Sequence, residues 1–401
     1  MEKRILIYTN HYYPENFKIN EITKWIEKKK FSIRVITAIP NYPSGKFFNG
    51  YGLFKKRYEK KDNIIINRLF VIPRGNGGYI RIILNYVSYF ISCFFFTIYI
   101  AIFKKKYDII FVHHTSPPLI IFHTLIYGLF HNTKNILWEL DLWPETLNSL
   151  NILNSKIINN LIELTMKKLY NSFDIILVGS YGFLDIIKSR FNKSVHYFPN
   201  WANSNIEENI IVNCPKMNIP DDHFKIMYTG NIGYSQNFDL IHELMVLKKT
   251  EKIFWIFIGD GRFKTKFKKL IEKNNLSKYI FINSIESKFI PWYQNNSDCL
   301  LLSLDSKGIF KQTVPAKLQS YMCAGKPIFA IIEGEASNII KESDCGFTCS
   351  PGDKNQISKK IQELIRLNKK DLIKFGKNAR NYYNRKFHSN KRKKQLLNLF
   401  K

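Results

Sequence analysis

The stretch TVPAKLQSYMCAGKPIFAIIEGEASNII, residues 313–340, has the order loop, apolar helix, tight break, buried strand and second helix. Pro315 suits the first turn of a helix, where the missing N–H has no intrahelical partner in any case. Gly325 can end that helix as its C-cap. The run KPIFAIIEG is apolar over most of its length, as is typical of parallel strands covered on both faces. We therefore expect an α/β fold.

Short apolar runs separated by helical segments recur along the chain of 401 residues. This alternation predicts parallel sheets with helices on both faces. The runs expected to be strands in the first half are RILIYTN, FSIRVITAIP, IIINRLFVIP, YDIIFVHH, NILWELD and FDIILVGS. Those expected in the second half are FKIMYTGNIG, FWIFIGDGR, YIFINSI, DCLLLSL and KPIFAIIEG.

A polar stretch interrupted by prolines, YFPNWANSNIEENIIVNCPKMNIPDD, separates the two sets of strands and is expected to connect two domains. We expect an N-terminal Rossmann-like domain over residues 1–200 and a C-terminal Rossmann-like domain over residues 201–380. A basic helix over residues 381–401 is expected to pack back toward the N-terminal domain. The two parallel sheets are expected to face a central cleft, with ligands beyond the carboxyl ends of the strands.

The chain is strongly basic, with 61 Lys and Arg against 32 Asp and Glu and a formal charge of +29. Such a charge favours polyanions such as nucleic acid, anionic lipid or phosphate-bearing substrates. The basic residues are scattered rather than interleaved with aromatics in a recognisable module, so nucleic acid is not the expected partner. The six cysteines show neither C-x-x-C pairs nor zinc spacing, and no signal-peptide hydrophobic region is found, which predicts a reducing, cytosolic compartment.

Residues 85–103, NYVSYFISCFFFTIYIAIF, carry no charged side chain and are followed by three lysines at 104–106. Three interpretations are open: a membrane span, a buried helix of the first domain, or an interfacial helix whose flanking lysines meet anionic headgroups. The aromatic content and the basic runs KKRYEKK and KKK favour the interfacial helix. A span would interrupt an alternating α/β domain.

Lys317 stands in the first turn of the helix expected after Pro315, where the helix dipole makes a cation unfavourable. A cation there is understandable if an anion lies between it and the unpaired N–H groups, and a diphosphate is such an anion. The alternative is a surface lysine that reaches an acidic neighbour.

The loop YTGNIGYSQNFD is a second candidate for phosphate binding. Gly233 lets the backbone approach a ligand closely, and Asn231 and Gln236 can donate hydrogen bonds. The alternative is an ordinary turn from a strand to a helix. GDGR at 259–262 is a weaker candidate because it is not a G-x-G-x-x-G sequence.

Several motifs resemble those of the retaining glycosyltransferases of family 4, which have the two-domain GT-B fold. The motifs that carry the resemblance, in chain order, are YYPENFKINE, IPNYPSGKFFNGY, ELDLWPETL, PNWAN, YTGNIGYSQNFD, FIGDGRFK, VPAKLQSYMCAGKPIFA and GEASNIIKESDCGF. They extend over nearly the whole chain. NYPSGKFFNGY, DLWPE and PNWAN are similar to the L-fucosamine transferases of O-antigen and capsule clusters and to colanic-acid-type enzymes.

The resemblance implies a retaining transfer of a sugar, such as the N-acetylated 6-deoxyhexosamine L-FucNAc, from a UDP-linked donor. The implied acceptor is a glycan on undecaprenyl diphosphate at the cytoplasmic face of the bacterial inner membrane, to which the enzyme would bind as a peripheral or monotopic protein. The second domain would bind the nucleotide sugar and the first domain the acceptor. No cofactor or metal is expected, because a lysine and a helix dipole would stabilise the leaving group.

By the same resemblance, Lys317, the helix N-terminus and the loop with Gly233 would hold the diphosphate. Asn231 and Gln236 stand where the family has arginine and lysine, so Lys307 or Lys311 is expected to assist. The family's pair of glutamates for the ribose is replaced by Gln312 and Ser320, which leaves Glu335 as an alternative polar contact. Uracil contacts are expected from Asn283 and Ile285. The expected donor site therefore consists of Asn231, Gly233, Gln236, Asn283, Ile285, Lys317 and Glu335.

On the acceptor side, many relatives have a His-Asp pair where WELDLWPE stands, and here Leu140 replaces the histidine while Asp141 remains. We expect Asp141 to be a catalytic carboxylate that orients donor or acceptor, with Glu145 and Glu139 as further candidates. The alternative for Asp141 is a helix N-cap. Glu15 and Asn16, after the first strand, are expected to face the same cleft.

A nonhydrolysing UDP-sugar 2-epimerase of the same fold is the alternative function, since fold alone does not decide function. The apolar and basic run at 85–106 argues against it. His113 and His114 are adjacent on an expected strand and therefore point to opposite faces, so a metal site is not expected there.

Overall fold

The computed structural model describes residues 3–29, 31–153, 155–212 and 219–400. The chain divides into two compact units, one formed by residues 1–198 with 393–401 and the other by residues 199–392. Part of the expected interdomain connection, residues 213–218 with Cys214, lies outside the described residues.

The first unit is built on an eight-stranded sheet in the order β3-β4-β2-β1-β5-β6-β7-β8. The pair of β3 and β4 is antiparallel, and the other pairs are parallel. The strands are β1 (Arg4–Thr9), β2 (Ser32–Ala38), β3 (Tyr58–Lys61), β4 (Ile64–Leu69), β5 (Ile109–His114), β6 (Lys134–Glu139), β7 (Ile175–Val178) and β8 (Ser194–Tyr197). The helices are α1 (Ile19–Glu27), α2 (Tyr79–Phe103), η1 (Pro118–Ile121), α3 (Phe122–Gly128), α4 (Glu145–Ser149), α5 (Lys156–Tyr170) and α6 (Gly182–Arg190).

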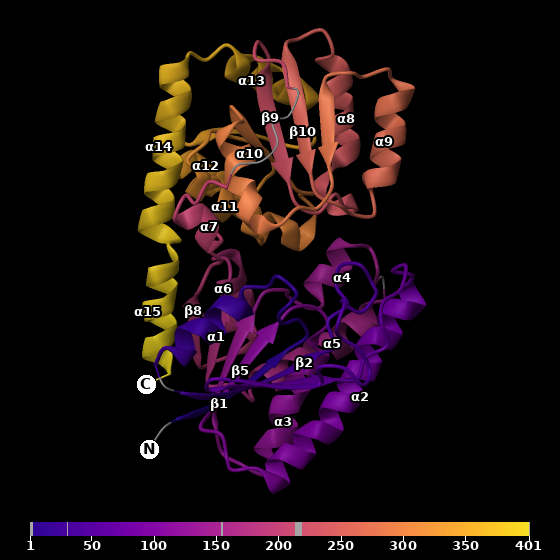
Figure 1. The fold of residues 1–401 in the computed structure, drawn as a ribbon, viewed down its shortest axis with the longest axis vertical. Helices are drawn as coiled ribbons and strands as arrows, with labels where there is room; N and C mark the ends of the chain where they lie inside the picture. The colour runs from indigo at the N-terminus through magenta and orange to yellow at the C-terminus, as the bar shows by residue number, and fades with distance from the viewer. Residues whose placement is uncertain (1–2, 30, 154, 213–218, 401) are drawn as a thin grey trace. The chain divides into compact units, whose positions relative to one another are not determined.

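Helices cover both faces of this sheet because side chains of its buried strands alternate between the faces. On one face Phe111 of β5 packs edge to face against Phe400, directly after helix α15 (Ser389–Leu399), with ring centroids 5.9 Å apart. On the other face Tyr8 of β1 reaches Thr97 of α2, with their hydroxyl oxygens 3.0 Å apart, and stacks on His123 of α3. Figure 1 shows α1 and α15 on one side of the strands and α2 and α3 on the other.

Helix α2 begins at Tyr79, earlier than the apolar run that starts at residue 85. Asn85, Tyr89, Cys93 and Thr97 are buried at helical spacing on one stripe. The Tyr89 hydroxyl lies 3.0 Å from the carbonyl of β1 residue 9 and so ties the helix to the sheet. Along the rest of α2 the exposed apolar side chains are Tyr79, Ile80, Ile83, Leu84, Val87, Ile91, Phe95, Tyr99, Ile102 and Phe103.

The length and composition of α2 would allow it to cross a membrane, but 33% of its most apolar window is buried in the unit. The helix is thus a packed element of the domain that also presents an apolar face.

The second unit contains a parallel six-stranded sheet in the order β11-β10-β9-β12-β13-β14, the strand order 3-2-1-4-5-6 of a dinucleotide-binding fold. Its strands are β9 (Phe224–Thr229), β10 (Ile253–Ile258), β11 (Tyr279–Ile282), β12 (Cys299–Ser303), β13 (Ile328–Ile331) and β14 (Gly346–Cys349). Its helices are α7 (Ser204–Glu207), η2 (Tyr234–Gln236), α8 (Phe238–Leu247), α9 (Lys264–Lys273), η3 (Ser287–Phe289), α10 (Ile290–Asn295), η4 (Gly308–Gln312), α11 (Ala316–Ala324), α12 (Glu335–Glu342), α13 (Lys354–Ile365) and α14 (Lys369–Lys386).

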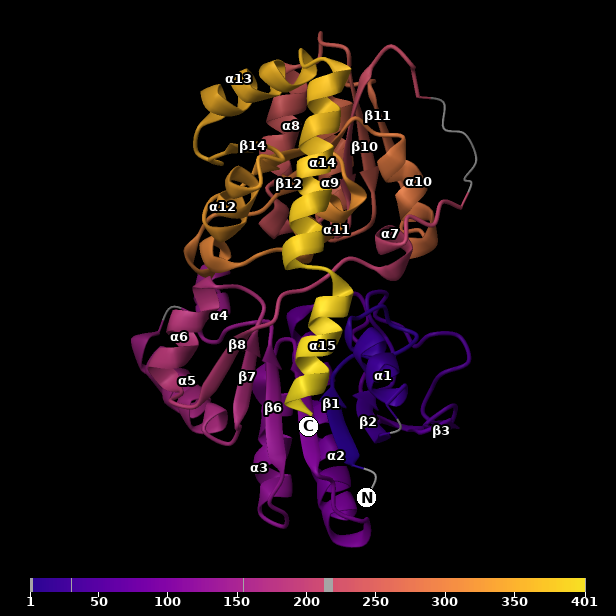
Figure 2. The ribbon, with the colours of Figure 1, turned by 90° about the vertical axis from the view of Figure 1, so that its left-hand side faces the viewer.

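The core of this unit lies between the sheet and helices α8, α9 and α13, where residues such as Phe257, Phe238, Phe267 and Ile361 pack together. Helix α11 packs against α14, and Figure 2 shows α14 in front of the sheet with α8 behind it. Both faces of the second sheet are therefore covered.

The expected α/β architecture is confirmed, and every apolar run expected to be a strand contains one. Three strands were not expected. Strand β3 is polar and exposed, while β8 and β14 have only four residues each. The expected single helix over 381–401 is wrong, because α14 extends to Lys386 and α15 starts at Ser389. Residues 393–401 belong to the first unit, where the side chain of Gln395 donates to the carbonyl of Tyr197 over 2.8 Å.

Candidate functional site

The candidate site of the second unit lies at the neighbouring strands β9 and β12. The strand order reverses between them, because the chain continues from β9 to β10 on one side and from β12 to β13 on the other. Ligands of doubly wound sheets bind at this switch point, beyond the carboxyl ends of the strands. Helix α11 follows β12 after the short helix η4, and its first turn holds Lys317. Pro315 is the N-cap residue rather than part of the first turn, and it supplies no side-chain cap. The first N–H groups of α11 thus have no capping side chain. At the other end Gly325 has φ 69°, which confirms it as the C-cap.

Lys317 is half-buried, and its ammonium lies over the Tyr228 ring, 4.2 Å from the centroid, while it donates to the Tyr228 hydroxyl. Within the described part of the chain it pairs with no carboxylate, so the interpretation as a surface lysine with an acidic neighbour is wrong. Because burial disfavours the charged form, it lowers the pKa of Lys317 to about 7. The side chain passes Gly230, where an added Cβ would lie 2.7 Å from the lysine Cε.

The loop after β9 is tied together by its own side chains. The Gln236 side-chain oxygen accepts from the Gly233 N–H over 3.0 Å and from the Asn231 amide over 3.4 Å. A Cβ on Gly233 would lie 2.6 Å from the Asn231 side-chain nitrogen, so a larger residue there would displace the side chains of Asn231 and Gln236. Asn231 and Gln236 thus contact each other in the loop that begins at Gly230, the glycine that the Lys317 side chain passes. Their contact with a phosphate stays a prediction.

The glycines of GDGR serve the packing of two loops. Gly259 has φ +142°, and a Cβ there would lie 2.0 Å from the carbonyl oxygen of Gly230. Gly261 has φ +156°, and a Cβ there would lie 2.3 Å from the oxygen of Ile232. The loops after β9 and β10 therefore touch backbone to backbone, a contact that only glycine allows.

Asn283 and Ile285 follow edge strand β11, on the same carboxyl edge of the sheet. The buried Lys264 donates to the Asn283 side-chain oxygen over 2.8 Å and to the carbonyl of Gly259 over 2.9 Å. Lys264 therefore links the loops after β10 and β11. The sequence offers no signal that separates this lysine from the many others.

Lys307 and Lys311, which are expected to assist Lys317 in binding the diphosphate, lie in different surroundings. Lys311 forms an ion pair of 2.7 Å with Glu333 and is thus already neutralised, and this hydrogen bond lowers the pKa of Glu333. Lys307 is exposed, at the start of η4. Glu335 is half-buried in the first turn of α12. Gln312 ends η4 and Ser320 lies within α11.

In the first unit, Asp141 follows β6 and its carboxylate accepts the backbone N–H of Ser116 over 3.1 Å. The N-cap of α4 is Pro144, and no side chain caps that helix, so the N-cap interpretation of Asp141 is wrong. Asp141 instead joins the loops after β5 and β6, at the carboxyl edge of the sheet. Glu145 forms an ion pair with the buried Arg190.

Glu139 and His114 form a buried pair under this edge, 2.5 Å apart between Oε1 and Nδ1. Burial opposes protonation of His114, but the charge and hydrogen bond of Glu139 outweigh it and raise the pKa of the imidazole. The hydroxyl of Tyr170 donates to the other Glu139 oxygen over 3.1 Å. Glu139 is therefore a positioning residue below Asp141, while His113 turns to the hydroxyl of Thr9.

Glu15 is buried, and its carboxylate is bonded within the unit. One oxygen accepts the N–H groups of Asn41 and Tyr42 over 2.7 and 2.6 Å, and the other lies 2.7 Å from Nδ1 of His11. Glu15 therefore holds the loop after β2 in place, whereas the neighbouring Asn16 is exposed. His11 was not expected in the site.

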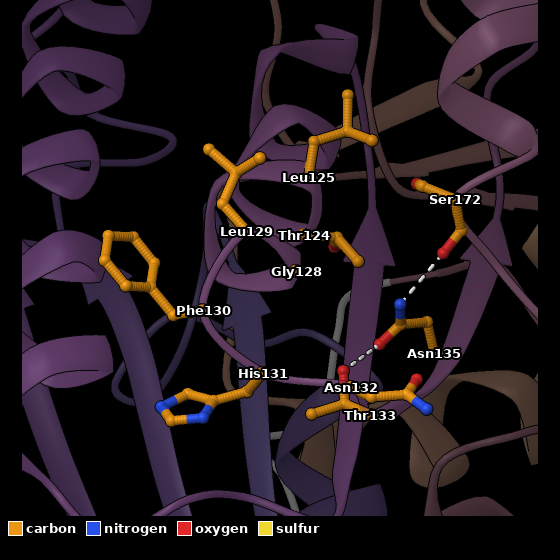
Figure 3. A pocket seen from close by; sticks show the side chains of 10 residues that line it. All are labelled: Thr124, Leu125, Gly128, Leu129, Phe130, His131, Asn132, Thr133, Asn135 and Ser172. Atoms are coloured by element: carbon orange, nitrogen blue, oxygen red, sulfur yellow. Dashed lines mark hydrogen bonds between the residues drawn. The ribbon is translucent and has the colours of Figure 1, made fainter.

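A hollow of about 590 Å³ lies at the opposite, amino-terminal edge of the first sheet, between the end of α3 and the starts of β6 and β7. Figure 3 shows that Asn135 bridges it, donating to the carbonyl of Ser172 over 2.8 Å and accepting from Thr133 over 2.7 Å. The hollow therefore lies at the opposite edge of the sheet from Asp141, which follows the end of β6. No cluster of three or more His, Cys, Asp or Glu side chains suited to a metal occurs within residues 3–400 as far as these are described.

Comparison with known proteins identifies a family and two relatives. Residues 212–382 match the family of glycosyl transferases group 1. The chain is 27% identical over 316 residues to a Pseudomonas aeruginosa protein named as a glycosyltransferase, WbjE. The aligned residues cover 76% of this chain and 77% of that protein. It is 21% identical over 350 residues to an Escherichia coli (strain K12) protein named as a colanic acid biosynthesis glycosyl transferase, WcaI, with 83% of this chain and 84% of that protein covered.

Among solved structures, one described as "Trehalose-6-phosphate from E. coli bound with UDP-2-fluoro glucose" superposes with a TM-score of 0.70 and 12% identity, covering 99% of both chains. That likeness shows the GT-B fold. The family match and the relatives show that the chain is a glycosyltransferase, similar to enzymes of bacterial polysaccharide synthesis, and they do not favour the epimerase.

Proposed function

We propose that this enzyme is a family 4 transferase that moves a sugar from a UDP-linked donor to a lipid-linked glycan with retention of configuration. The observation that carries the proposal is Lys317, a half-buried ammonium at a helix N-terminus that pairs with no carboxylate among the described residues. An anion completes such a site. A solved structure with the same fold binds a UDP-sugar analogue, which supports UDP as the nucleotide.

The proposed chemistry follows from the charge that develops on the leaving group. As the glycosidic bond breaks, the diphosphate gains negative charge, which Lys317 and the first N–H groups of α11 are placed to stabilise. Tyr228 positions the ammonium, because its hydroxyl accepts from Lys317 while it donates to the carbonyl of Asn231 over 2.5 Å. No metal ion is part of this proposal, since lysine and helix end supply the positive charge.

The roles proposed for the other candidate residues follow from their positions at the carboxyl edges of the two sheets. Asp141 orients the donor or the acceptor, and Asn16 contacts the acceptor. On the donor side, contacts are proposed from the loops that meet at the carboxyl edge of the second sheet, namely from Asn231, Gly233, Gln236, Asn283, Ile285 and Glu335.

The proposed acceptor is a glycan on undecaprenyl diphosphate, reached at the cytoplasmic face of the inner membrane. The exposed apolar face of α2 supports an interfacial position, and the lysines at 104–106 follow that helix directly. Membrane binding of this kind is peripheral or monotopic, because hydrogen bonds from α2 to the sheet keep the helix on its domain. The relative named for colanic acid biosynthesis supports a role in surface polysaccharide. The proposed sugar is an N-acetylated 6-deoxyhexosamine such as L-FucNAc, in O-antigen or capsule synthesis.

Titration calorimetry of the purified protein with UDP, GDP and ADP tests the donor site. We expect UDP to bind at least about tenfold more tightly than the other two nucleotides. Preference for GDP would contradict a UDP-linked donor, and absence of binding by all three would contradict the diphosphate site itself.

A further inference from the structure

Arg74 lies in the loop between β4 and α2, and its guanidinium contacts two tyrosine rings. The Cζ atom is 5.1 Å from the ring centroid of Tyr42 and 5.1 Å from that of Tyr86. Tyr42 comes from the loop after β2, and Tyr86 comes from the second turn of α2. A guanidinium that lies over aromatic rings keeps the N–H groups on its edge as the part that can bind a ligand.

The hydrogen bonds of Arg74 are long. They join its N–H groups to the side-chain oxygen of Asn85 over 3.3 Å, to the Tyr86 hydroxyl over 3.3 Å and to Nε2 of His11 over 3.4 Å. Arg34 likewise donates to a hydroxyl and an amide oxygen, but these hydrogen bonds measure 2.5 and 2.6 Å. Over the described ranges, Arg74 pairs with no carboxylate. Its donors are therefore weakly satisfied.

The nearest carboxylate in this network serves other groups. Glu15 lies on the far side of the His11 imidazole, 2.7 Å from its Nδ1. The tautomer that carries its hydrogen on Nδ1 would donate to Glu15 and leave Nε2 as an acceptor toward Arg74. Glu15 also accepts the N–H groups of Asn41 and Tyr42. The negative charge is thus separated from the guanidinium by a ring.

The surroundings hold Arg74 in place before any ligand arrives. The buried Asn85 donates to the carbonyl of Ile72 over 2.6 Å and to the side-chain oxygen of Asn41 over 3.2 Å. The N–H of Gly75 donates to the carbonyl of Gly45 over 2.9 Å, and a Cβ on Gly45 would lie 1.8 Å from the Gly75 oxygen. This close backbone contact locks the loop next to Arg74. A preorganised site loses less entropy on binding.

We propose that Arg74, with Tyr42, Tyr86 and His11, forms the subsite for the diphosphate of the lipid-linked acceptor. The planar fork of arginine matches phosphate oxygens. The site lies in a loop at the carboxyl edge of the first sheet, and the exposed apolar residues Tyr79 and Ile80 begin α2 a few positions later. A phosphate at Arg74 can therefore carry a hydrocarbon chain along α2. The subsite rests on the proposed function, because that function supplies the lipid-linked acceptor.

Geranyl diphosphate, a soluble isoprenyl diphosphate, tests the subsite by titration calorimetry in saturating UDP, which occupies the site at Lys317. We expect the wild type to bind and Arg74→Gln to weaken binding at least about tenfold, the effect of losing a charge-assisted contact. Arg74→Lys keeps the charge without the fork and is expected to be intermediate. The matched control is Arg81→Gln, an exposed arginine of α2, which should change binding less than about twofold.

Equal binding by the wild type and Arg74→Gln, or no binding by the wild type, overturns the subsite. If Arg74→Gln does not fold, Arg74→Lys decides in the same way. Sedimentation with phosphatidylglycerol vesicles distinguishes a phospholipid headgroup as the ligand: an effect of Arg74→Gln on vesicles but not on geranyl diphosphate contradicts the proposal. Arg74-dependent binding without any sugar transfer would leave the subsite standing and refute the proposed function. Sugar transfer by the wild type, together with geranyl diphosphate binding that Arg74→Gln does not change, would support the proposed function and refute the subsite.

Discussion

Lys317→Met removes the ammonium that the donor-site account depends on while keeping an unbranched apolar side chain beside the Tyr228 ring. With a pKa of about 7, Lys317 is mostly neutral at pH 8 in the free protein. A bound diphosphate favours the charged form and raises the pKa above the working pH. UDP is itself fully ionised at pH 8, because the second pKa of a phosphate is about 6. Binding at pH 8 should therefore take up most of one proton at this lysine.

Titration calorimetry in Hepes and in Tris at pH 8 measures this uptake, because the two buffers differ in enthalpy of ionisation. The apparent binding enthalpy of the wild type should change with the buffer by an amount that corresponds to uptake of a proton by Lys317. The enthalpy of Lys317→Met should be independent of the buffer, and its affinity for UDP at pH 7 should be at least about tenfold weaker. From pH 7 to 9 the wild-type affinity should fall as the lysine loses its proton.

Lys354→Met is the matched control, since Lys354 is an exposed lysine in a surface ion pair with Glu243. Such pairs contribute little, so this variant should behave as the wild type. Zero proton uptake by the wild type, or undiminished uptake by Lys317→Met, would refute the assignment of the diphosphate to Lys317.

The remaining predictions concern the membrane face, the glycine beside Lys317 and the carboxylate. Ile83→Ser combined with Phe95→Ser removes exposed apolar area from α2 and should weaken sedimentation with anionic vesicles at least about tenfold; unchanged sedimentation would contradict an interfacial α2. Gly230→Ala places a Cβ 2.7 Å from Cε of Lys317 at φ +121°, so UDP affinity should drop several-fold in calorimetry, and full affinity would contradict the described path of the lysine. Asp141→Asn should lower kcat at least about tenfold with UDP affinity unchanged, whereas an undiminished kcat would contradict its catalytic role.

Two controls accompany these variants. Leu247→Ser changes an exposed leucine at the end of α8 and should leave vesicle binding unchanged. Gly128→Ala places a Cβ in open space and should leave UDP affinity unchanged.

The fold could be predicted because buried strands of parallel sheets are short apolar runs, as in β9 and β10. Strand β3 could not be predicted from hydrophobicity, because its sequence YEKK lies exposed at the sheet edge and pairs by its backbone with β4. The break between α14 and α15 was missed for a related reason. The basic pattern continues through Phe387, so composition does not mark the end of a helix there.

The candidate site was predictable where one local feature decides the chemistry, as at Lys317, where a lysine meets a helix N-terminus. The N-cap interpretation of Asp141 failed because its carboxylate accepts the N–H of Ser116, which is distant in the sequence, while Pro144 is the N-cap of α4. Arg74 was not predictable. It is one of 61 basic residues, and its contact with His11 joins positions far apart in the sequence.

An assay of sugar transfer decides whether this enzyme uses a UDP-linked donor and whether Lys317 is essential. The purified enzyme is incubated with radiolabelled UDP-L-FucNAc and lipid extracted from bacterial membranes, and label in the lipid phase and free UDP are both measured. The account predicts that label enters the lipid phase in step with UDP release, that GDP-linked sugars give none, and that Lys317→Met abolishes transfer. Transfer from a GDP-linked donor, or transfer that survives in Lys317→Met, would contradict it.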